Sequence, residues 1–181
     1  MQVTPLAISG VALITPRRFD DERGWFMESY RADVVDHLNS GRPFIQDNHV
    51  YSATRGTLRG MHFQREPWAQ AKLVRVLRGV VYDVVVDIRA ESPTRGQWVG
   101  VELTAESSQS LLVPRGFAHG YLTLVDDCEV HYKVDAPYVP DAEDGLCWND
   151  PSLKFIWPLR DQPFKVKPKD LSWPAFGREI F

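Results

Sequence analysis

The chain is a succession of short runs rich in valine, isoleucine and aromatic residues, separated at close intervals by glycine, proline, asparagine or aspartate. The strongest signal covers residues 70–89, where two valine-rich runs flank Gly79, and a clean alternation of apolar and polar residues follows at 98–104. Short runs bounded by turn residues are typical of antiparallel strands and not of a βαβ fold. The sequence therefore predicts an all-β sandwich or barrel.

Three segments add detail to this β pattern. Apolar residues recur at helical spacing over 32–39 and the run ends at Gly41, so a short helix is expected there. Residues 119–125 and 128–134 are expected to form a hairpin, because two aspartates between them provide a turn. The proline and tryptophan content rises from Asp135 onwards, which indicates an extended C-terminal tail wrapped on the body.

Length and charge limit the possible functions. The 181 residues suit a single domain, 1–181, which is large enough to bury a core without disulfides or a structural metal. A formal net charge of -3 and a pI near 5.9 argue against a general binder of nucleic acid or of anionic membranes. No segment approaches the ~18 uninterrupted apolar residues of a membrane span, and the N-terminus lacks the charged leader of a targeting signal.

The cysteine content points to a reducing compartment. Cys128 and Cys147 are too few and too far apart for a zinc knuckle or a disulfide framework. Both are interpreted as buried small hydrophobic residues. Together with the absence of a leader and of a membrane span, this predicts a cytoplasmic protein.

One strand in the first half of the chain carries an arginine, a histidine and an amide, and glycines at positions 56 and 60 permit sharp turns of its backbone. Alternate side chains of a strand point to opposite faces, so His62 and Gln64 share one face. Arg59 reaches that face only if Gly60 allows a bulge. We interpret this strand as the wall of a cavity.

Two patterns resemble in part the metal-binding motifs of the cupin superfamily. The first has the form Gly-x5-His-x-His and is matched at His62, but Gln64 replaces the second histidine. The second, Pro-x-Gly-x2-His-x3-Asn, is matched by the run that ends at His119, with Thr123 in the last position. This resemblance implies a cupin-type jelly-roll barrel of antiparallel strands with a few short helices. Because a transition-metal site usually takes three or four ligands and two histidines remain, we expect a metal-free cavity.

Six short runs then occur in a fixed order along the chain. They are QDN (46–48), LRGMHFQ (58–64), KLVRV (72–76), GVVYDV (79–84), PRGFAHG (114–120) and WNDP (148–151). Together they resemble the dTDP-4-dehydrorhamnose 3,5-epimerase family over nearly the whole chain. The resemblance implies an epimerase without metal or cofactor that inverts C3 and C5 of dTDP-4-keto-6-deoxy-D-glucose. The product would be dTDP-4-keto-L-rhamnose, an intermediate of dTDP-L-rhamnose biosynthesis.

By this resemblance four residues carry the chemistry. His62 is the base, and Asp170 fixes its tautomer and stabilises the imidazolium that forms on proton uptake. Tyr132 is the acid on the opposite face of the sugar, because a reference pKa of ~10 keeps a phenol protonated at neutral pH. Lys72 lies where the family stabilises the enolate oxygen at C4.

The same resemblance assigns further positions to binding of the sugar, the diphosphate or the nucleoside. Tyr138 falls where an aromatic ring stacks on thymine. The other positions are Arg23, Glu28, Gln46, Asn48, Arg59, His119, Glu143 and Lys169. The family forms homodimers with exchanged N-terminal strands, which would let Phe19 and Arg23 act across the interface.

Each catalytic residue also has a structural interpretation. Lys72 could extend along apolar neighbours from a strand end, Tyr132 could be a core aromatic, and Asp170 could be a solvated turn acid. Three functions stay open: the 3,5-epimerase, a relative that inverts only C3 or only C5, and a binding-only or metal-dependent cupin. The joint presence of His62, Lys72 and Tyr132 argues against a binding-only protein, and Gln64 argues against a metal-dependent one.

Overall fold

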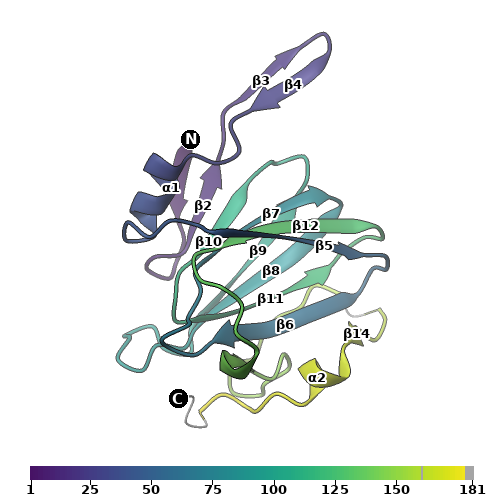
Figure 1. Cartoon of the computed structure of the whole chain (residues 1–181). Coiled ribbons are helices and arrows are strands. Elements are labelled where there is room, and N and C mark those ends of the chain that lie inside the picture. Colours follow the sequence, from purple (N-terminus) through teal and green to yellow (C-terminus); the bar gives the residue numbers. More distant parts are fainter. Residues whose placement is uncertain (160, 178–181) are drawn as a thin grey trace.

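Two antiparallel sheets face each other in the computed structural model, which describes residues 1–159 and 161–177 (Figure 1). In spatial order, the first sheet contains β1 (Gln2–Pro5), β2 (Ala12–Thr15), β10 (Ser110–Val113), β7 (Lys72–Arg78), β12 (Cys128–Val134) and β5 (Gln46–Ser52). The second contains β13 (Glu143–Gly145), β6 (Thr57–Gln64), β11 (Phe117–Thr123), β8 (Val80–Asp87) and β9 (Trp98–Thr104). A short strand, β14 (Lys165–Val166), pairs in parallel with β6. The predicted all-β antiparallel architecture is confirmed.

Valines from both sheets form the interior of the barrel. Val74 and Val76 of β7 meet Val81 and Val85 of β8, and Phe117 of β11 packs into the same cluster. These side chains are fully buried or nearly so. Because strand side chains alternate between faces, every second residue of each run points inward, and β-branched residues pack well on such a surface.

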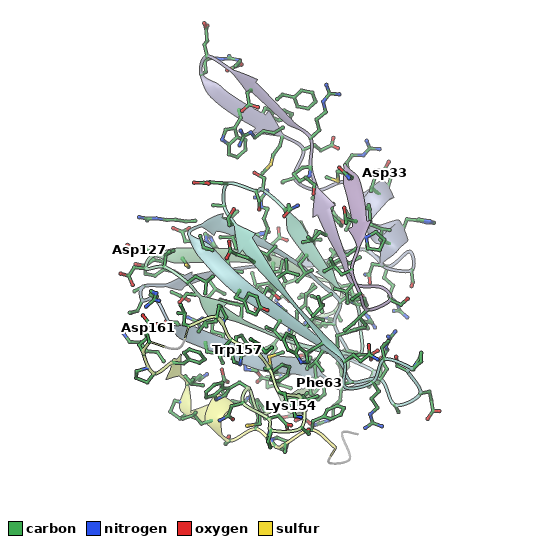
Figure 2. The ribbon with its side chains drawn as sticks, turned by 180° about the vertical axis from the view of Figure 1, so that it is seen from behind. Asp33, Phe63, Asp127, Lys154, Trp157 and Asp161 are labelled. Carbon is green, nitrogen blue, oxygen red and sulfur yellow. The ribbon has the colours of Figure 1, made fainter. Side chains whose placement is uncertain are left out.

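The outer face of the second sheet is also apolar, and the C-terminal tail covers it. Met61 and Val84 lie on this face, with Leu153, Trp157 and other tail residues packed against them. Figure 2 shows Trp157 and Phe63 between the sheet and the C-terminal segment. The tail also forms a single turn, η1 (Pro140–Ala142), and a short helix, α2 (Pro168–Leu171). The predicted wrapped tail is therefore confirmed.

The expected hairpin between residues 119–125 and 128–134 is wrong, although both strands exist. β11 lies between β6 and β8 in the second sheet, whereas β12 lies between β7 and β5 in the first. The connection between them crosses from one sheet to the other. Since each strand already has a neighbour on both sides, neither has a free edge for the other.

The predicted helix is present as α1 (Ala32–Leu38), and it covers the outer face of the first sheet. Its Val35 is fully buried against Ile14, Leu73 and Leu112. Of the two cysteines, Cys128 lies in the barrel interior as predicted.

The burial predicted for Cys147 is wrong. This thiol is partly exposed, and its Sγ lies 2.8 Å from the side-chain oxygen of Asn149. Cys147 belongs to the C-terminal tail, where the chain crosses the surface of the barrel.

A hairpin of β3 (Arg18–Asp21) and β4 (Gly24–Met27) projects from the body (Figure 1). Its aromatic residues Phe19, Trp25 and Phe26 are about half exposed or more. None of the helices in the described residues is long and apolar enough to span a membrane.

Candidate active site

A cavity of about 460 Å³ opens at one end of the barrel and is lined by both sheets and by the tail. The side chains around it are mainly basic, aromatic or histidine. The lining residues are Val50, Thr57, Leu58, Arg59, His62, Lys72, His119, Tyr121, Tyr132, Glu143, Lys165, Lys167, Lys169 and Asp170.

A bulge in β6 brings Arg59 and His62 to the same cavity. His62 pairs with His119 of β11, but Arg59 pairs with Tyr121, so the register shifts between them. Gly60 lies at this shift with a φ of 148°, and a Cβ there would lie 2.6 Å from the Cα of Gly120. Only glycine fits so close an approach of two backbones. The condition under which Arg59 reaches the face of His62, a bulge at Gly60, is therefore met.

Gln64 does not line the cavity, although parity placed it with His62. Its side-chain nitrogen donates to the carbonyl oxygens of Trp68 and Pro137, and its side-chain oxygen accepts from the backbone N–H of Val139. The amide is therefore fully engaged in joining two loops.

A carboxylate orients the His62 ring. His62 Nε2 lies 2.8 Å from Asp170 Oδ1, and Asp170 Oδ2 accepts a hydrogen bond of 3.4 Å from the backbone N–H of Gly60. Asp170 is buried, and burial alone would raise its pKa, but the hydrogen bond and charge of His62 hold the pKa below its usual range. The geometry is that of a histidine whose tautomer is set by an ionised carboxylate.

A second histidine–carboxylate pair joins the cavity lining to the residue behind it, because His119 lines the cavity and Asp83 does not. His119 Nε2 lies 2.8 and 3.0 Å from the two oxygens of Asp83, which is fully buried on β8. Burial lowers the pKa of His119, while the Asp83 charge and hydrogen bond oppose that change. The ring therefore stays neutral at neutral pH, with one nitrogen committed to Asp83.

Lys72 enters the cavity from the first sheet. Its parity with Val74 and Val76 directs it inward, and its Nζ donates to the backbone oxygen of His62 at 3.3 Å. Burial lowers the pKa of Lys72 to about 8, against the charges of Asp83 and Glu143, which raise it. The side chain is cationic at neutral pH and poorly solvated, which makes it a strong partner for a developing oxyanion.

Tyr132 faces the histidines from β12 of the first sheet. Its ring packs against the barrel interior, and burial raises the pKa of its phenol. Tyr121 of β11 also lines the cavity; its buried hydroxyl has no hydrogen-bond partner among the described residues. Both phenols are protonated at neutral pH and able to donate.

Charged groups of the tail surround the mouth of the cavity. Glu143 accepts hydrogen bonds from Lys169 Nζ and, at 2.7 Å, from the Tyr138 hydroxyl. Arg59 donates to Ser52 Oγ at 3.2 Å. Fixed basic side chains of this kind suit a polyanionic ligand such as a diphosphate.

Comparison with known proteins fits this geometry. A family model described as dTDP-4-dehydrorhamnose 3,5-epimerase matches residues 5–178. The chain belongs to this family. The dTDP-4-dehydrorhamnose 3,5-epimerase of Pseudomonas aeruginosa is 47% identical to it over 179 residues, which cover 98% of this chain and 97% of that protein.

Two further relatives of this epimerase-family chain differ in their specificity. The dTDP-6-deoxy-D-glucose-3,5-epimerase of Legionella pneumophila, solved in complex with dTDP-4-keto-L-rhamnose, superimposes with a TM-score of 0.90 at 39% identity, covering 96% of this chain and 92% of that one. A dTDP-4-dehydrorhamnose 3-epimerase of Streptomyces niveus is 38% identical over 180 residues, 99% of this chain and 86% of that protein. The close structural match confirms the predicted cupin-type jelly roll.

Most positions that the epimerase family implies lie together in the structure. Eight of them line the cavity: His62, Lys72, Tyr132, Asp170, Arg59, His119, Glu143 and Lys169. Three more lie beside it. Gln46 and Asn48 are on β5, where Asn48 pairs with Tyr132 and accepts from the Gln46 amide at 2.9 Å, and Tyr138 is joined to Glu143.

Arg23 and Glu28 do not reach the cavity of their own chain. Arg23 lies in the turn of the projecting hairpin, where it pairs with Asp21 at 2.6 Å and its side chain is 84% exposed. Figure 1 shows this hairpin at the opposite end of the molecule from α2 and β14. Glu28 follows the hairpin and lies near Arg31.

Some residues of this epimerase-family cavity were not predicted. They are Val50, Thr57, Leu58, Tyr121, Lys165, Lys167 and, behind the wall, Asp83. Two features of the sequence could have predicted some of these residues. Val50 has the parity of Gln46 and Asn48, and Lys165 and Lys167 alternate with Lys169 along an extended segment.

Residues 1–159 and 161–177 contain no group of three or more His, Cys, Asp or Glu side chains placed to hold a metal ion. In the cavity, the carboxylates next to the histidines are already engaged with their rings.

Proposed function

We propose that this protein inverts C3 and C5 of dTDP-4-keto-6-deoxy-D-glucose to give dTDP-4-keto-L-rhamnose. The observation that carries the proposal is the arrangement of three groups around one cavity: His62 with its carboxylate on the second sheet, Tyr132 on the facing sheet, and the buried cation Lys72. These are the groups that inversion through an enolate requires.

The substrate itself explains why one site can serve two carbons. C3 and C5 both adjoin the C4 ketone, so loss of a proton from either gives an enolate whose charge lies on the same oxygen. A base on one face of the ring removes the proton, and an acid on the other face returns one. Because the ketone stabilises the carbanion, the proposed reaction needs no cofactor.

The roles follow from the chemistry of each side chain. His62 removes the proton, and Asp170 stabilises the imidazolium that forms. Lys72 neutralises the enolate oxygen at C4. Tyr132 donates a proton from the facing sheet, where burial raises the pKa of its phenol and so keeps it protonated between turnovers.

The nucleotide half of the substrate is proposed to lie along the mouth of the cavity. There the chain supplies basic side chains for the diphosphate and an exposed ring, Tyr138, for stacking on thymine. Hydroxyl groups of the two sugars would be bound by amides, carboxylates and imidazole. The proposed binding residues are Gln46, Asn48, Arg59, His119, Glu143 and Lys169 in the same chain, with Arg23 and Glu28 supplied by a neighbour.

Residues supplied by a neighbour require a homodimer of these single-domain chains. The proposed compartment of the dimer is the cytoplasm. The half-exposed aromatic residues of the β3–β4 hairpin support the dimer, because such a surface is usually covered by a partner. If Arg23 serves the neighbouring cavity, mixing Arg23→Ala and His62→Ala chains restores about a quarter of the wild-type rate, the share of intact sites after random re-association. No recovery on mixing would place Arg23 outside the neighbour's site.

A single-site epimerase is the second candidate, because a 3-epimerase shares 38% identity with this chain. Proton NMR of dTDP-4-keto-6-deoxyglucose in D2O separates the two. Deuterium at both C3 and C5, with a rhamnose-configured product trapped by a 4-keto reductase, is the expected result. Deuterium at one carbon only would assign the protein to the single-site enzymes, and none at either carbon would indicate a binding protein.

A further inference from the structure

Asp83 is a fully buried carboxylate at the back of the cavity wall. It lies in the middle of β8, opposite Tyr121 of β11 and Val101 of β9. His119 is its one side-chain partner among the described residues: Nε2 of that ring lies 2.8 Å from Oδ1 and 3.0 Å from Oδ2, and neither oxygen has a second donor there. Burial of a carboxylate with so few hydrogen-bond donors costs free energy of folding, which suggests that Asp83 has a function.

Asp87, on the same strand, shows what a structural carboxylate looks like. It is equally buried, but it accepts hydrogen bonds from the backbone and guanidinium of Arg89 and from the hydroxyls of Ser92 and Thr94. These bonds hold the pKa of Asp87 well below its usual range even though burial alone would raise it. The carboxylate of Asp87 is therefore fully hydrogen-bonded within its own loop. The carboxylate of Asp83 has fewer partners, so its charge can act on groups in the cavity.

Two cavity residues receive that charge. His119 is bonded to Asp83 directly, and Lys72 of the facing wall lies close to this pair, because its Nζ donates to the backbone oxygen of His62, the residue that pairs with His119. Burial lowers the pKa of Lys72, and the Asp83 charge is the foremost of the two that oppose this, ahead of Glu143. The other titratable groups that line the cavity are Arg59, His62, Tyr121, Tyr132, Lys165, Lys167, Lys169 and Asp170.

We propose that Asp83 is a positioning residue, which keeps Lys72 protonated and holds His119 in a single tautomer. The carboxylate accepts the Nε2 proton of His119, so a neutral ring presents Nδ1 as an acceptor for a sugar hydroxyl. The same charge stabilises the ammonium form of Lys72 in a site that disfavours it. The part that concerns catalysis rests on the proposed function, in which Lys72 stabilises the enolate oxygen.

Direct titration of Lys72 tests the electrostatic part without relying on turnover. In protein labelled with 13C-lysine, the Cε signal that disappears in Lys72→Arg is followed between pH 6 and 10 by NMR. The wild-type signal is expected to titrate near pH 8, as burial implies. In Asp83→Asn the midpoint falls by at least about one pH unit, the usual effect of an opposite charge at short range. An unchanged midpoint would overturn the proposal.

Asp87→Asn is the matched control, since it removes an equally buried carboxylate from the same strand. Its Lys72 midpoint stays at the wild-type value, and an equal fall in both variants would assign the effect to general loosening of the barrel. If Asp83→Asn does not fold, the 15N signals of the His119 ring are measured in the wild-type protein instead. The proton is expected on Nε2, with Nδ1 unprotonated at pH 7, and a proton on Nδ1 would overturn the proposal.

Kinetics tests the consequence for catalysis. In Asp83→Asn, kcat at pH 8 falls at least about fivefold more than kcat at pH 6, because Lys72 is neutral in a larger share of molecules. A structural defect would lower kcat equally at both pH values. If the Lys72 midpoint shifts as expected but the wild-type protein exchanges no deuterium into the sugar, the positioning role stands and the proposed function fails.

Discussion

The two walls of the cavity hold their polar groups in opposite ways. On the second sheet, His62 and His119 each lie 2.8 Å from a carboxylate oxygen. On the first sheet, Lys72 and Tyr132 lie beside the apolar interior, and burial moves the pKa of the lysine to about 8 and raises that of the tyrosine. A carboxylate stabilises a proton added to imidazole, whereas burial keeps a phenol neutral. His62 on one wall is therefore placed to accept a proton, and Tyr132 on the other to retain one until it is donated.

The two histidines of the second sheet differ in exposure. The His62 side chain is 29% exposed and the His119 side chain 8%, although their carboxylates are equally close. A general base must reach the proton that it removes, so the more open imidazole is suited to proton transfer. The more buried one is suited to holding a substrate in place.

The largest expected effect separates these two histidines. His62→Ala removes the base, so deuterium exchange at both C3 and C5 falls by up to ~10⁴-fold. His119→Ala is the matched variant and should mainly raise KM while exchange continues. The rates are measured by proton NMR in D2O at saturating substrate. Equal loss of exchange in the two variants would contradict the assignment of His62 as the base.

The next effect tests the wall formed by the first sheet. Tyr132→Phe removes a proton donor and leaves the base intact, so the recovered substrate should still gain deuterium while inversion falls by roughly 10³-fold. Inversion is followed with a 4-keto reductase that consumes the rhamnose-configured product. Tyr121→Phe removes the other phenol of the cavity and serves as the control. Normal inversion by Tyr132→Phe would show that the proton comes from another group.

A smaller loss is expected from Asp170→Asn. The amide cannot stabilise an imidazolium and can favour the wrong tautomer of His62, so kcat falls by roughly 10²-fold with little change in KM. Steady-state rates with the coupled reductase measure this change. A rise in KM alone would mean that Asp170 serves binding and leaves proton transfer unaffected.

The smallest effect concerns stability in acid. The folded pKa of Asp170 is lower than the unfolded value, so its pairing stabilises the fold above pH ~4 and this contribution is lost as pH falls through the folded pKa. Wild type should exceed Asp170→Asn by about 1–2 kcal/mol in free energy of unfolding at pH 6, and the gap should narrow as the pH falls below about 4. Urea unfolding at a fixed protein concentration tests this. A gap that is constant with pH would point to packing and not to charge.

Local rules predicted much of both walls. The alternation of side chains along a strand explains why Lys72 and Tyr132 face the interior, and Gly60 marked the point at which a bulge could bring Arg59 beside His62. Both inferences depend on neighbours within a few residues. Strand parity also predicted that Gln64 faces the cavity. This prediction was wrong, because the side-chain amide of Gln64 forms hydrogen bonds with loop residues whose positions the strand pattern does not predict.

Features that depend on distant parts of the chain were harder to predict. Asp83 meets His119 only because β8 pairs with β11 in one particular register, and the sequence of either strand alone does not specify it. The hairpin expected between the strands now labelled β11 and β12 failed for a similar reason. A turn at two aspartates looks the same whether the chain folds back on itself or crosses to the other sheet.

The separation of His62 from Asp170 also has a consequence in time. The two residues of this pair lie 108 positions apart, with the carboxylate following the histidine. At the usual speed of translation, ~5–20 residues per second, the histidine leaves the ribosome roughly 5–20 s before its partner. During that interval the barrel strand can form, but its base has no carboxylate to orient it. Catalytic competence therefore waits until the tail has returned to β6.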